Sequence, residues 1–330
     1  PWNFPFILAV RKAAPALAAG CPVVLKPASA TPLCCVAFAE SVAEADLPPG
    51  VFQLVLGKSS EIGAEFLSNP LCRKISFTGS TPVGKKLIAA AAEQVTKLSL
   101  ELGGHAPVLV FDDADLEVAV EGALAAKMRN TAQSCIAANR LYVQRKIYDR
   151  FVDTFVERVR RFKIGNGLDD EVDVGPLINA SALDTAQQHV DEACQRGAEL
   201  LCGGRRWGGQ GYFFEPTVIA NVPDDALCMV EETFAPVMPL CAFDDEQEAI
   251  HKANATRYGL AAYAFTRDVS RVWRIAEGLE AGTIGINDGV PSTSNCPFGG
   301  LKQSGWGREL GAEGIEAFLE TKHVSLGVEA

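Results

Sequence analysis

Two short stretches contain the residue types that thiol chemistry requires. Cys135 follows the small and polar residues 130–134, which are typical of a loop. Glu101 ends the apolar run 98–100, where a strand would finish. A free thiol has a pKa of ~8.5 and needs activation, and a carboxylate can act as a base directly or through water. Each residue also has an ordinary interpretation, a buried thiol for Cys135 and an ion-paired or capping carboxylate for Glu101.

Other enzyme motifs are incomplete or absent. The stretch 79–86 has nearly the spacing of a P-loop, but Lys86 stands where Ser or Thr would hold magnesium, and Pro82 lacks an N–H for the phosphate cradle. This stretch could still bind a phosphate at a helix N-terminus, or it could be an ordinary glycine turn. No GxSxG and no GxGxxG motif occurs, so neither a serine hydrolase nor a standard Rossmann cofactor site is supported.

The composition is that of an ordinary soluble globular protein. The chain has 330 residues, 48% hydrophobic and 22% charged, which is enough for two domains. The net charge of −11 repels nucleic acid and anionic membranes, so we expect neither as a partner. No apolar run reaches the ~18 residues of a membrane span. The ten cysteines form no CxxC pair and the four histidines lie far apart, so we expect no metal site and mostly reduced thiols in a cytosol-like compartment.

Short apolar runs alternate with helical patterns in the first hundred residues. We expect strands at 22–26, 51–56, 74–78 and 97–100, and helices at 31–44, 60–67 and 82–94. This alternation predicts βαβ units and a parallel sheet. Ligands of such sheets bind beyond the carboxyl ends of the strands, where Lys26, residues 78–80 and Glu101 lie.

The alternation restarts after Gly103 and Gly104, and we place the domain boundary there because paired glycines let a chain pivot. We expect strands at 106–111 and 140–144, and helices at 115–129, 147–161, 245–254, 270–277 and 311–320. Asp115 is the expected N-cap of the first of these helices. The tail 322–328 has a strand pattern that needs a sheet edge, in this chain or in a neighbouring subunit.

Seven stretches in order resemble the aldehyde dehydrogenase superfamily, over essentially the whole chain. They are PWNFP at 1–5, KPA at 26–28, FTGS at 77–80, ELGG at 101–104, QSC at 133–135, ETFAPV at 232–237 and PFGGLKQSG at 297–305. One such motif is weak, whereas seven in order are highly specific. Residues 76–81 and 111–115 resemble the succinate-semialdehyde dehydrogenase branch of the family.

The resemblance implies an α/β fold of the aldehyde dehydrogenase type with two parallel-sheet domains. Residues 1–102 would form a partial dinucleotide-binding domain and residues 103–303 the catalytic domain with the thiol nucleophile. Residues 304–330 would return to the cofactor domain and end in an oligomerisation strand. Family members have a long segment before Pro1, and this chain does not begin with Met, so we expect part of the cofactor sheet and of the oligomerisation arm to be missing.

The resemblance also implies a reaction. Cys135 would attack an aldehyde to give a thiohemiacetal, and hydride transfer to a nicotinamide would leave a thioester. The side-chain amide of Asn3 and the N–H of Cys135 would hold the oxyanion, an effect worth ~3–4 kcal/mol per donor. Glu101 would then activate the water that hydrolyses the thioester. A thiol suits this scheme, since it adds well to carbonyls and leaves readily from a thioester.

The cofactor site implied by the resemblance contains eight residues. They are Trp2, Lys26, Ser29, Gly79, Ser80, Leu102, Glu232 and Phe234. Ser29 stands where NAD-preferring relatives often have a Glu that would repel a 2′-phosphate, and Lys26 supplies a cation nearby. We therefore predict that NADP is preferred and NAD also accepted. The alternative is that Ser29 only caps the following helix.

The substrate site implied by the resemblance favours a semialdehyde with a carboxylate. Arg11, Arg129 and Ser292 would bind this carboxylate, because a guanidinium grips two oxygens at once, and Phe298 would form a wall of the pocket. Succinate semialdehyde is the first choice and glutarate semialdehyde the second, since one methylene discriminates by only ~1–3 kcal/mol. The alternative is that each arginine pairs with a surface acid.

Four positions depart from the family pattern. Ala132 and Ala235 replace common glycines and would be strained if those glycines were left-handed. His105 stands where Asn often follows the glycine pair. Ala137 stands where some semialdehyde enzymes have a second Cys, so we expect no local disulfide with Cys135.

Three alternatives for function and location stay open. The chain could be an inactive partial member of the family, or a thiol hydrolase that uses Cys135 and Glu101 without a cofactor. Otherwise we expect a cytoplasmic homodimer or homotetramer that acts on a small aldehyde. Targeting to an organelle stays possible because the true N-terminus is not in view.

Overall fold

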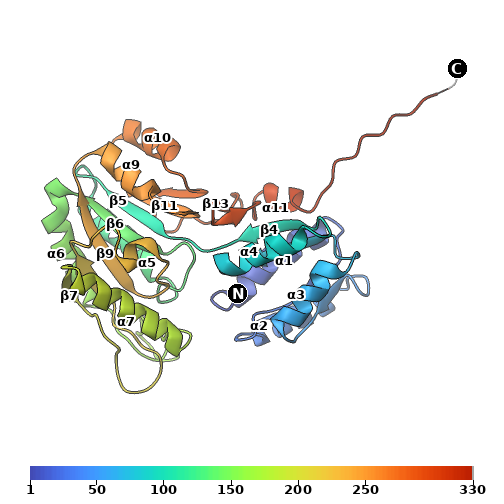
Figure 1. Cartoon of the computed structure of the whole chain (residues 1–330), viewed down its shortest axis with the longest axis horizontal. Coiled ribbons are helices and arrows are strands. Elements are labelled where there is room, and N and C mark those ends of the chain that lie inside the picture. Colours follow the sequence, from blue (N-terminus) through green and yellow to red (C-terminus); the bar gives the residue numbers. More distant parts are fainter. Residues whose placement is uncertain (329–330) are drawn as a thin grey trace. The chain divides into compact units, whose positions relative to one another are not determined.

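The computed structural model describes residues 1–328, which form two compact units (Figure 1). Unit 1 comprises Pro1–Leu100, Thr293–Phe298 and Trp306–Ala330, and unit 2 comprises Glu101–Ser292 and Gly299–Gly305. The chain thus passes from unit 1 to unit 2 at Glu101 and returns twice near its end.

Unit 2 is built on a seven-stranded sheet in the order β12-β11-β5-β6-β9-β8-β7. The strands are β5 (Ala106–Val110), β6 (Ala138–Gln144), β7 (Glu199–Cys202), β8 (Thr217–Ala220), β9 (Val237–Phe243), β11 (Ala261–Phe265) and β12 (Thr283–Ile286). All neighbours are parallel except β7 and β8. Every residue of β5, β8 and β11 is buried, as expected for parallel strands that are covered on both faces.

Helices cover both faces of this sheet. They are α5 (Leu116–Met128), α6 (Tyr148–Val159), α7 (Ala180–Gln195), α9 (Glu246–Asn254) and α10 (Val269–Gly278), with the shorter η1 (Arg145–Ile147) and α8 (Leu227–Val230). One apolar cluster joins Val108 and Val110 to α5 and α6, and a second joins Leu109 and Phe111 to α7, α9 and α10. The alternation along β5 is the period of two that sends successive side chains to opposite faces.

Unit 1 contains two smaller sheets. β1 (Val23–Leu25) pairs in parallel with β2 (Phe52–Leu54), and β14 (Gly305–Trp306), β4 (Lys97–Glu101) and β3 (Lys74–Thr78) pair in that order. The helices are α1 (Pro5–Ala18), α2 (Leu33–Glu44), α3 (Ser59–Ser68), α4 (Thr81–Ala91) and α11 (Glu313–Glu316). In unit 2, β10 (Tyr258–Gly259) and β13 (Leu301–Lys302) add an antiparallel pair. None of the described helices is long and apolar enough to cross a membrane.

Most of the expected elements are present, and two expectations at the end of the chain have a different outcome. The helix expected at 311–320 is only α11, because Gly311 has a φ of +59° and Gly314 also weakens a helix. The tail 322–328 forms no strand in the described chain, so its pairing with a neighbouring subunit stays a prediction.

Candidate active site

The loop before Cys135 has an unusual backbone. Asn130, Thr131 and Ala132 have φ values of +54°, +54° and +61°, a conformation that costs a residue with a side chain roughly 1–2 kcal/mol. The strain expected at Ala132 is therefore present. At the other departure from the family pattern, the positive φ of +53° falls on Phe234 and not on Ala235, so Ala235 carries no such strain.

Two side chains hold the loop in this conformation by binding residues 175–178. The hydroxyl of Thr131 accepts from the N–H of Gly175 at 3.1 Å and lies 3.3 Å from its carbonyl oxygen. The amide oxygen of Gln133 accepts from the N–H of Ile178 at 2.9 Å, and its nitrogen donates to the carbonyl of Pro176 at 3.3 Å. Hydrogen bonds to residues 175–178 thus stabilise the conformation of the nucleophile loop.

Tyr263 brings Cys135 and Arg129 to one place. Its hydroxyl donates to the carbonyl of Ile136 at 2.7 Å, directly after the candidate nucleophile. Burial raises the pKa of Tyr263, the charges of Cys135 and Asp288 raise it further, and Arg129 lowers it. The thiol and the guanidinium therefore lie within electrostatic reach of the same hydroxyl. The sequence analysis did not single out Tyr263, which lies in an apolar run.

The segment after Glu101 packs against the nucleophile loop. Glu101 is 3% exposed and Leu102 is also 3% exposed. A Cβ added to Gly104 would lie 2.0 Å from the carbonyl oxygen of Cys135, so only glycine allows this approach. The structure thus brings the candidate base segment and the candidate nucleophile loop into contact.

Glu232 joins this contact from a third segment. Its carboxylate accepts from the N–H of Gly104 at 3.1 Å. Burial raises the pKa of Glu232 to about 7, while the N–H of Gly104 and the charge of Lys127 lower it. His189 and Thr233 support the segment, with His Nδ1 and the threonine hydroxyl 3.0 Å apart. Glu232 and Phe234 therefore lie on a segment that touches the one after Glu101.

Lys127 is a buried cation that the sequence analysis missed. It is fully buried on α5, and its ammonium donates to the side-chain oxygen of Asn139 at 2.8 Å. Burial lowers the pKa of Lys127 to about 7, although the charges of Cys228 and Glu232 raise it. The available signal was a lysine among the alanines and leucines of the predicted helix 115–129.

Lys26 and Ser29 lie together in unit 1, after β1. The ammonium of Lys26 donates to the hydroxyl of Ser29 at 3.3 Å and to that of Ser59 at 2.7 Å. The alternative that Ser29 caps the next helix is wrong, because the N-cap of α2 is Pro32. Ser59, at the start of α3, was missed by the sequence analysis although Ser often marks a helix start.

The other cofactor-site candidates of unit 1 lie around the start of α4 and the start of the chain. Ser80 is the N-cap of α4. A Cβ at Gly79 would lie 2.4 Å from the ring of Phe77, so the turn between β3 and α4 favours glycine there. Trp2 is half-buried at the beginning of unit 1, as is the oxyanion candidate Asn3.

The substrate candidates are divided between the two units, each of which is described by itself. Arg11 lies on α1, with its guanidinium carbon 5.0 Å from the centre of the Phe298 ring in unit 1. Arg129 and the half-buried Ser292 belong to unit 2. Next to Arg11, Lys12 forms an ion pair with Glu309 in which both side chains are largely buried. The sequence analysis did not single out this pair, and its spacing of 297 residues gave no local signal.

Residues 1–328 contain no cluster of three or more His, Cys, Asp or Glu side chains that could hold a metal ion.

Comparison with known proteins gives a consistent result. The family model described as "Aldehyde dehydrogenase family" matches residues 1–324. The chain is 51% identical over 328 residues to the succinate-semialdehyde dehydrogenase [NADP(+)] GabD of Escherichia coli (strain K12), covering 99% of this chain and 68% of that protein. It is also 51% identical over 327 residues to a glutarate-semialdehyde dehydrogenase of Pseudomonas aeruginosa, with the same two coverages.

A solved structure shows the same fold. The crystal structure of an E. coli NADP-dependent enzyme has a TM-score of 0.98 and 51% sequence identity, covering 99% of this chain and 68% of that one. The chain covers 62% of the mitochondrial succinate-semialdehyde dehydrogenase of Arabidopsis thaliana, to which it is 51% identical. The chain thus spans about two thirds of the length of these relatives.

Proposed function

The chain belongs to the aldehyde dehydrogenase family, and on that premise we propose that it oxidises succinate semialdehyde to succinate with NADP, and with NAD more weakly. The observation that carries the proposal is the contact between Gly104 and the carbonyl of Cys135, which joins the segment of a carboxylate to the loop of a thiol. The names of the most similar relatives support the choice of substrate.

In the proposed reaction, the sulfur of Cys135 forms a bond to the aldehyde carbon, and the carbonyl oxygen becomes an oxyanion. The amide of Asn3 and the N–H of Cys135 donate to that oxygen. A nicotinamide cofactor bound at the candidate site in unit 1 would supply the hydride acceptor for this carbon. Glu101 then accepts a proton from water, the water oxygen bonds to the thioester carbon, and the C–S bond breaks to release the carboxylate and the thiolate.

Lys26, Ser29 and Ser59 fit the phosphate of NADP. They place two hydroxyls, one after β1 and one at the start of α3, within hydrogen-bond distance of a single ammonium. A phosphate accepts hydrogen bonds from all three groups, and the cation strengthens them. Ser80 at the start of α4 and the carboxylate of Glu232 would bind the pyrophosphate and a ribose, respectively.

Arg129 supports a substrate with a carboxylate. Its charge acts on the pKa of Tyr263, as does the charge of Cys135, so both side chains lie on the Tyr263 side of unit 2. Arg11 and Ser292 would complete the site, with Phe298 as a wall. Glutarate semialdehyde is the second candidate, because a relative of equal identity has that name and one methylene discriminates by only ~1–3 kcal/mol.

We also propose that the enzyme is a cytoplasmic homodimer or homotetramer. The tail 322–328 supports this proposal, since its apolar residues Val324, Leu326 and Val328 are 75–83% exposed and need a sheet edge to cover them.

Reduced nicotinamide absorbance tests the proposed function. Succinate semialdehyde and NADP should give NADPH with the parent chain, and Cys135→Ser should lower the rate by at least roughly 10³-fold, since the nucleophile is lost. The cofactor-independent hydrolase predicts ester hydrolysis but no NADPH. Absence of both activities in the folded parent would favour the inactive partial chain.

A further inference from the structure

Arg140 is a buried cation that has no role in the proposed reaction. It lies on β6, five residues after Cys135, and is 1% exposed. Its guanidinium makes four hydrogen bonds, and each acceptor is a backbone carbonyl. The bonds run from Nε and Nη2 to His105 at 3.1 and 2.9 Å, from Nη1 to Lys252 at 3.0 Å, and from Nη2 to Ala253 at 2.9 Å.

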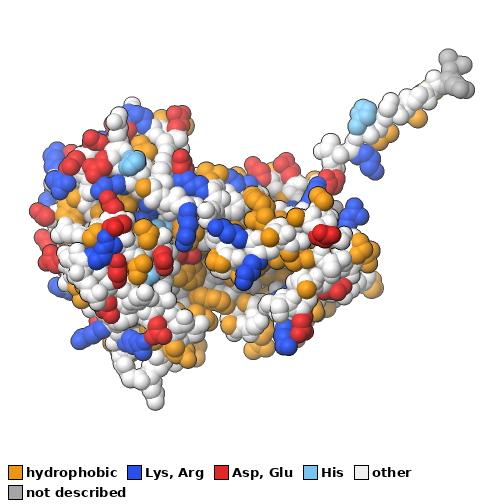
Figure 2. Space-filling model, in the orientation of Figure 1, with side chains coloured by type: hydrophobic (Ala, Val, Ile, Leu, Met, Phe, Trp, Pro, Cys, Tyr) orange, Lys and Arg blue, Asp and Glu red, His pale blue; other side chains and the backbone are white. Residues whose placement is uncertain are grey.

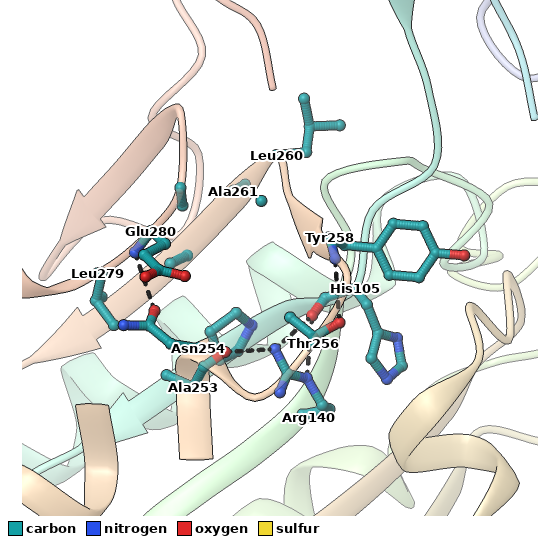
Figure 3. Close-up of a pocket in the computed structure, with 14 residues that line it drawn as sticks. His105, Arg140, Ala253, Asn254, Thr256, Tyr258, Leu260, Ala261, Leu279 and Glu280 are labelled. Carbon is teal, nitrogen blue, oxygen red and sulfur yellow. Dashed lines mark hydrogen bonds between the residues drawn. The ribbon is translucent and has the colours of Figure 1, made fainter. Parts of the chain in front are cut away.

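These acceptors belong to two different parts of unit 2, the end of α9 and the segment after Glu101 (Figure 3). Lys252 and Ala253 lie in the last turn of α9, at the negative end of the helix dipole, and the carbonyl of Lys252 also accepts from the N–H of Ala255 at 3.3 Å. Burial lowers the pKa of Arg140, and the nearby groups of Tyr142, Asp224 and Cys241 oppose that shift. The helix end is therefore an anchor that holds a buried cation in one position.

The carbonyl of His105 belongs to the segment that follows Glu101. Two further groups hold the same segment. Ser304 accepts from the N–H of Leu102 at 2.8 Å through its carbonyl and donates to the carbonyl of Gly103 at 2.7 Å through its hydroxyl. Glu232 accepts from the N–H of Gly104. The backbone of residues 102–105 is therefore fixed at each residue by a group from a distant part of unit 2.

Arg140 differs from the other two groups because it also lies on the strand that follows Cys135. Its side chain joins that strand to the segment after Glu101, and Gly104 in this segment touches the carbonyl of Cys135. We propose that Arg140 is a positioning residue, which fixes the distance between the thiol of Cys135 and the carboxylate of Glu101. This inference rests on the proposed function and names a residue that acts through the backbone of His105, without touching the substrate.

The two half-reactions of the thiol should respond differently. In acylation by p-nitrophenyl acetate, the sulfur bonds to the acyl carbon and p-nitrophenolate leaves, so the position of Glu101 matters less. In deacylation, Glu101 takes a proton from water, the water oxygen bonds to the acyl carbon, and the thiolate leaves. Loss of Arg140 should therefore slow deacylation more than acylation. Neither step needs a cofactor.

The experiment compares Arg140→Gln, Arg140→Lys and a control in p-nitrophenyl acetate hydrolysis, followed as burst and steady state over pH 6–9. Arg140→Gln should keep the burst and lower the steady-state rate at least tenfold. Arg140→Lys keeps the charge and can reach either the carbonyl of His105 or those at the end of α9, so its steady-state rate should fall by a smaller factor. Ser304→Ala removes one bond to the same segment and should slow the same step by a smaller factor.

Asn254→Ala is the matched control. Asn254 is the last residue of α9 and lines the pocket in Figure 3 together with Arg140, but its side chain forms hydrogen bonds with Gly278 and Glu280, at 2.8 and 2.9 Å. This variant should melt at a lower temperature and keep both the burst and the steady-state rate within twofold. Equal slowing by Asn254→Ala would overturn the positioning role.

The remaining outcomes separate the inference from the proposed function. An unchanged steady-state rate in Arg140→Gln or, where that variant does not fold, in Arg140→Lys would overturn the inference and leave the proposed function intact. A parent without a burst, or a burst that survives in Cys135→Ser, would overturn the proposed function and the inference with it.

Discussion

The two units differ in how they support the residues of the proposed site. In unit 2, three strands are buried along their whole length and helices cover both faces of the sheet. In unit 1, no residue of β1, β2 or β3 is fully buried, and large apolar side chains are exposed. Phe6, Leu33 and Leu71 are 54%, 77% and 87% exposed. Hydrophobic side chains gather over α1 to α4 in Figure 2, whereas charged side chains are spread over unit 2.

This difference shows what each unit can tolerate. Unit 2 holds a strained loop, a buried lysine with a lowered pKa and a buried arginine, because its packed sheet stabilises them. Unit 1 holds its cofactor candidates Lys26, Ser29 and Ser59 at exposed strand and helix ends. We therefore expect substitutions at the site of unit 2 to change stability together with activity, and those in unit 1 to change binding alone.

The largest expected effect concerns the substrate carboxylate. The parent should favour succinate semialdehyde over butanal by roughly a hundredfold in kcat/KM, about 2.7 kcal/mol, within reach of a charge-assisted pair. Arg129→Ala in unit 2 and Arg11→Ala in unit 1 should each erase much of this ratio and leave butanal turnover nearly intact. Equal use of both aldehydes by the parent would contradict the semialdehyde assignment.

The second prediction concerns the pH dependence of unit 2. The pKa of Lys127 is lowered to about 7, so its contribution to stability is complete above its unfolded pKa of ~10.4 and is lost as pH falls towards 7. We compare the unfolding free energy of Lys127→Met with that of the parent at each pH. This difference should favour the variant by on the order of 2 kcal/mol more at pH 6 than at pH 9.

Urea unfolding at the two pH values measures this difference. Lys146→Met is the control, because Lys146 is 78% exposed and pairs with Asp112 at the surface. If the unfolding free energies of the parent and of Lys127→Met changed equally with pH, the lowered pKa of Lys127 would be contradicted.

The third prediction belongs to unit 1 and tests whether binding there is independent of stability. Ser29→Glu should shift the ratio of kcat/KM for NADP and NAD roughly tenfold towards NAD, about 1.4 kcal/mol, because a carboxylate repels the 2′-phosphate. Ser59→Ala should weaken NADP alone by a smaller factor. Neither substitution should change the melting temperature, since both residues are exposed. A parent that strongly favours NAD would contradict the assignment.

The smallest expected effect is a change in stability caused by a substitution in unit 2. Ala132→Gly should raise the unfolding free energy by about 1 kcal/mol or less, because relief of the positive φ is partly offset by the larger freedom of glycine in the unfolded chain. Chemical unfolding measures it, with Ala137→Gly as a control, since Ala137 is also buried and has no positive φ. A loss of stability at Ala132 equal to that at Ala137 would show that the loop is unstrained.

The features that could be predicted best from the sequence are those that depend on residues close together in the chain. The strand at Lys74–Thr78 and the N-cap Asp115 were both correct, because period and capping are local properties. The strands β8, β9, β11 and β12 were not singled out, since continuous apolar runs do not distinguish a buried strand from a buried helix by their period. The four residues of β8, for example, are all buried.

The site was predictable where motifs carry it and not where distant contacts do. The assignments of Cys135 and Glu101, which stay predictions, rest on their own stretches. The partners of Arg140 lie 35 and 113 residues away, and nothing in the local pattern of Arg140 indicates them. Lys127 is similar, because its pKa is lowered by burial under a sheet that the sequence predicts only in part.

The left-handed run at Asn130, Thr131 and Ala132 also has a consequence for the order of folding. At roughly 1 kcal/mol per residue, an unfolded chain visits this shape about a hundredfold less often than an ordinary turn. The contacts that select it come from residues 175–178, over 40 positions later in synthesis. We therefore expect the nucleophile loop to take its final shape after the sheet has closed. Until then, Cys135 would lack the close contact between its carbonyl and Gly104 that joins it to the segment after Glu101.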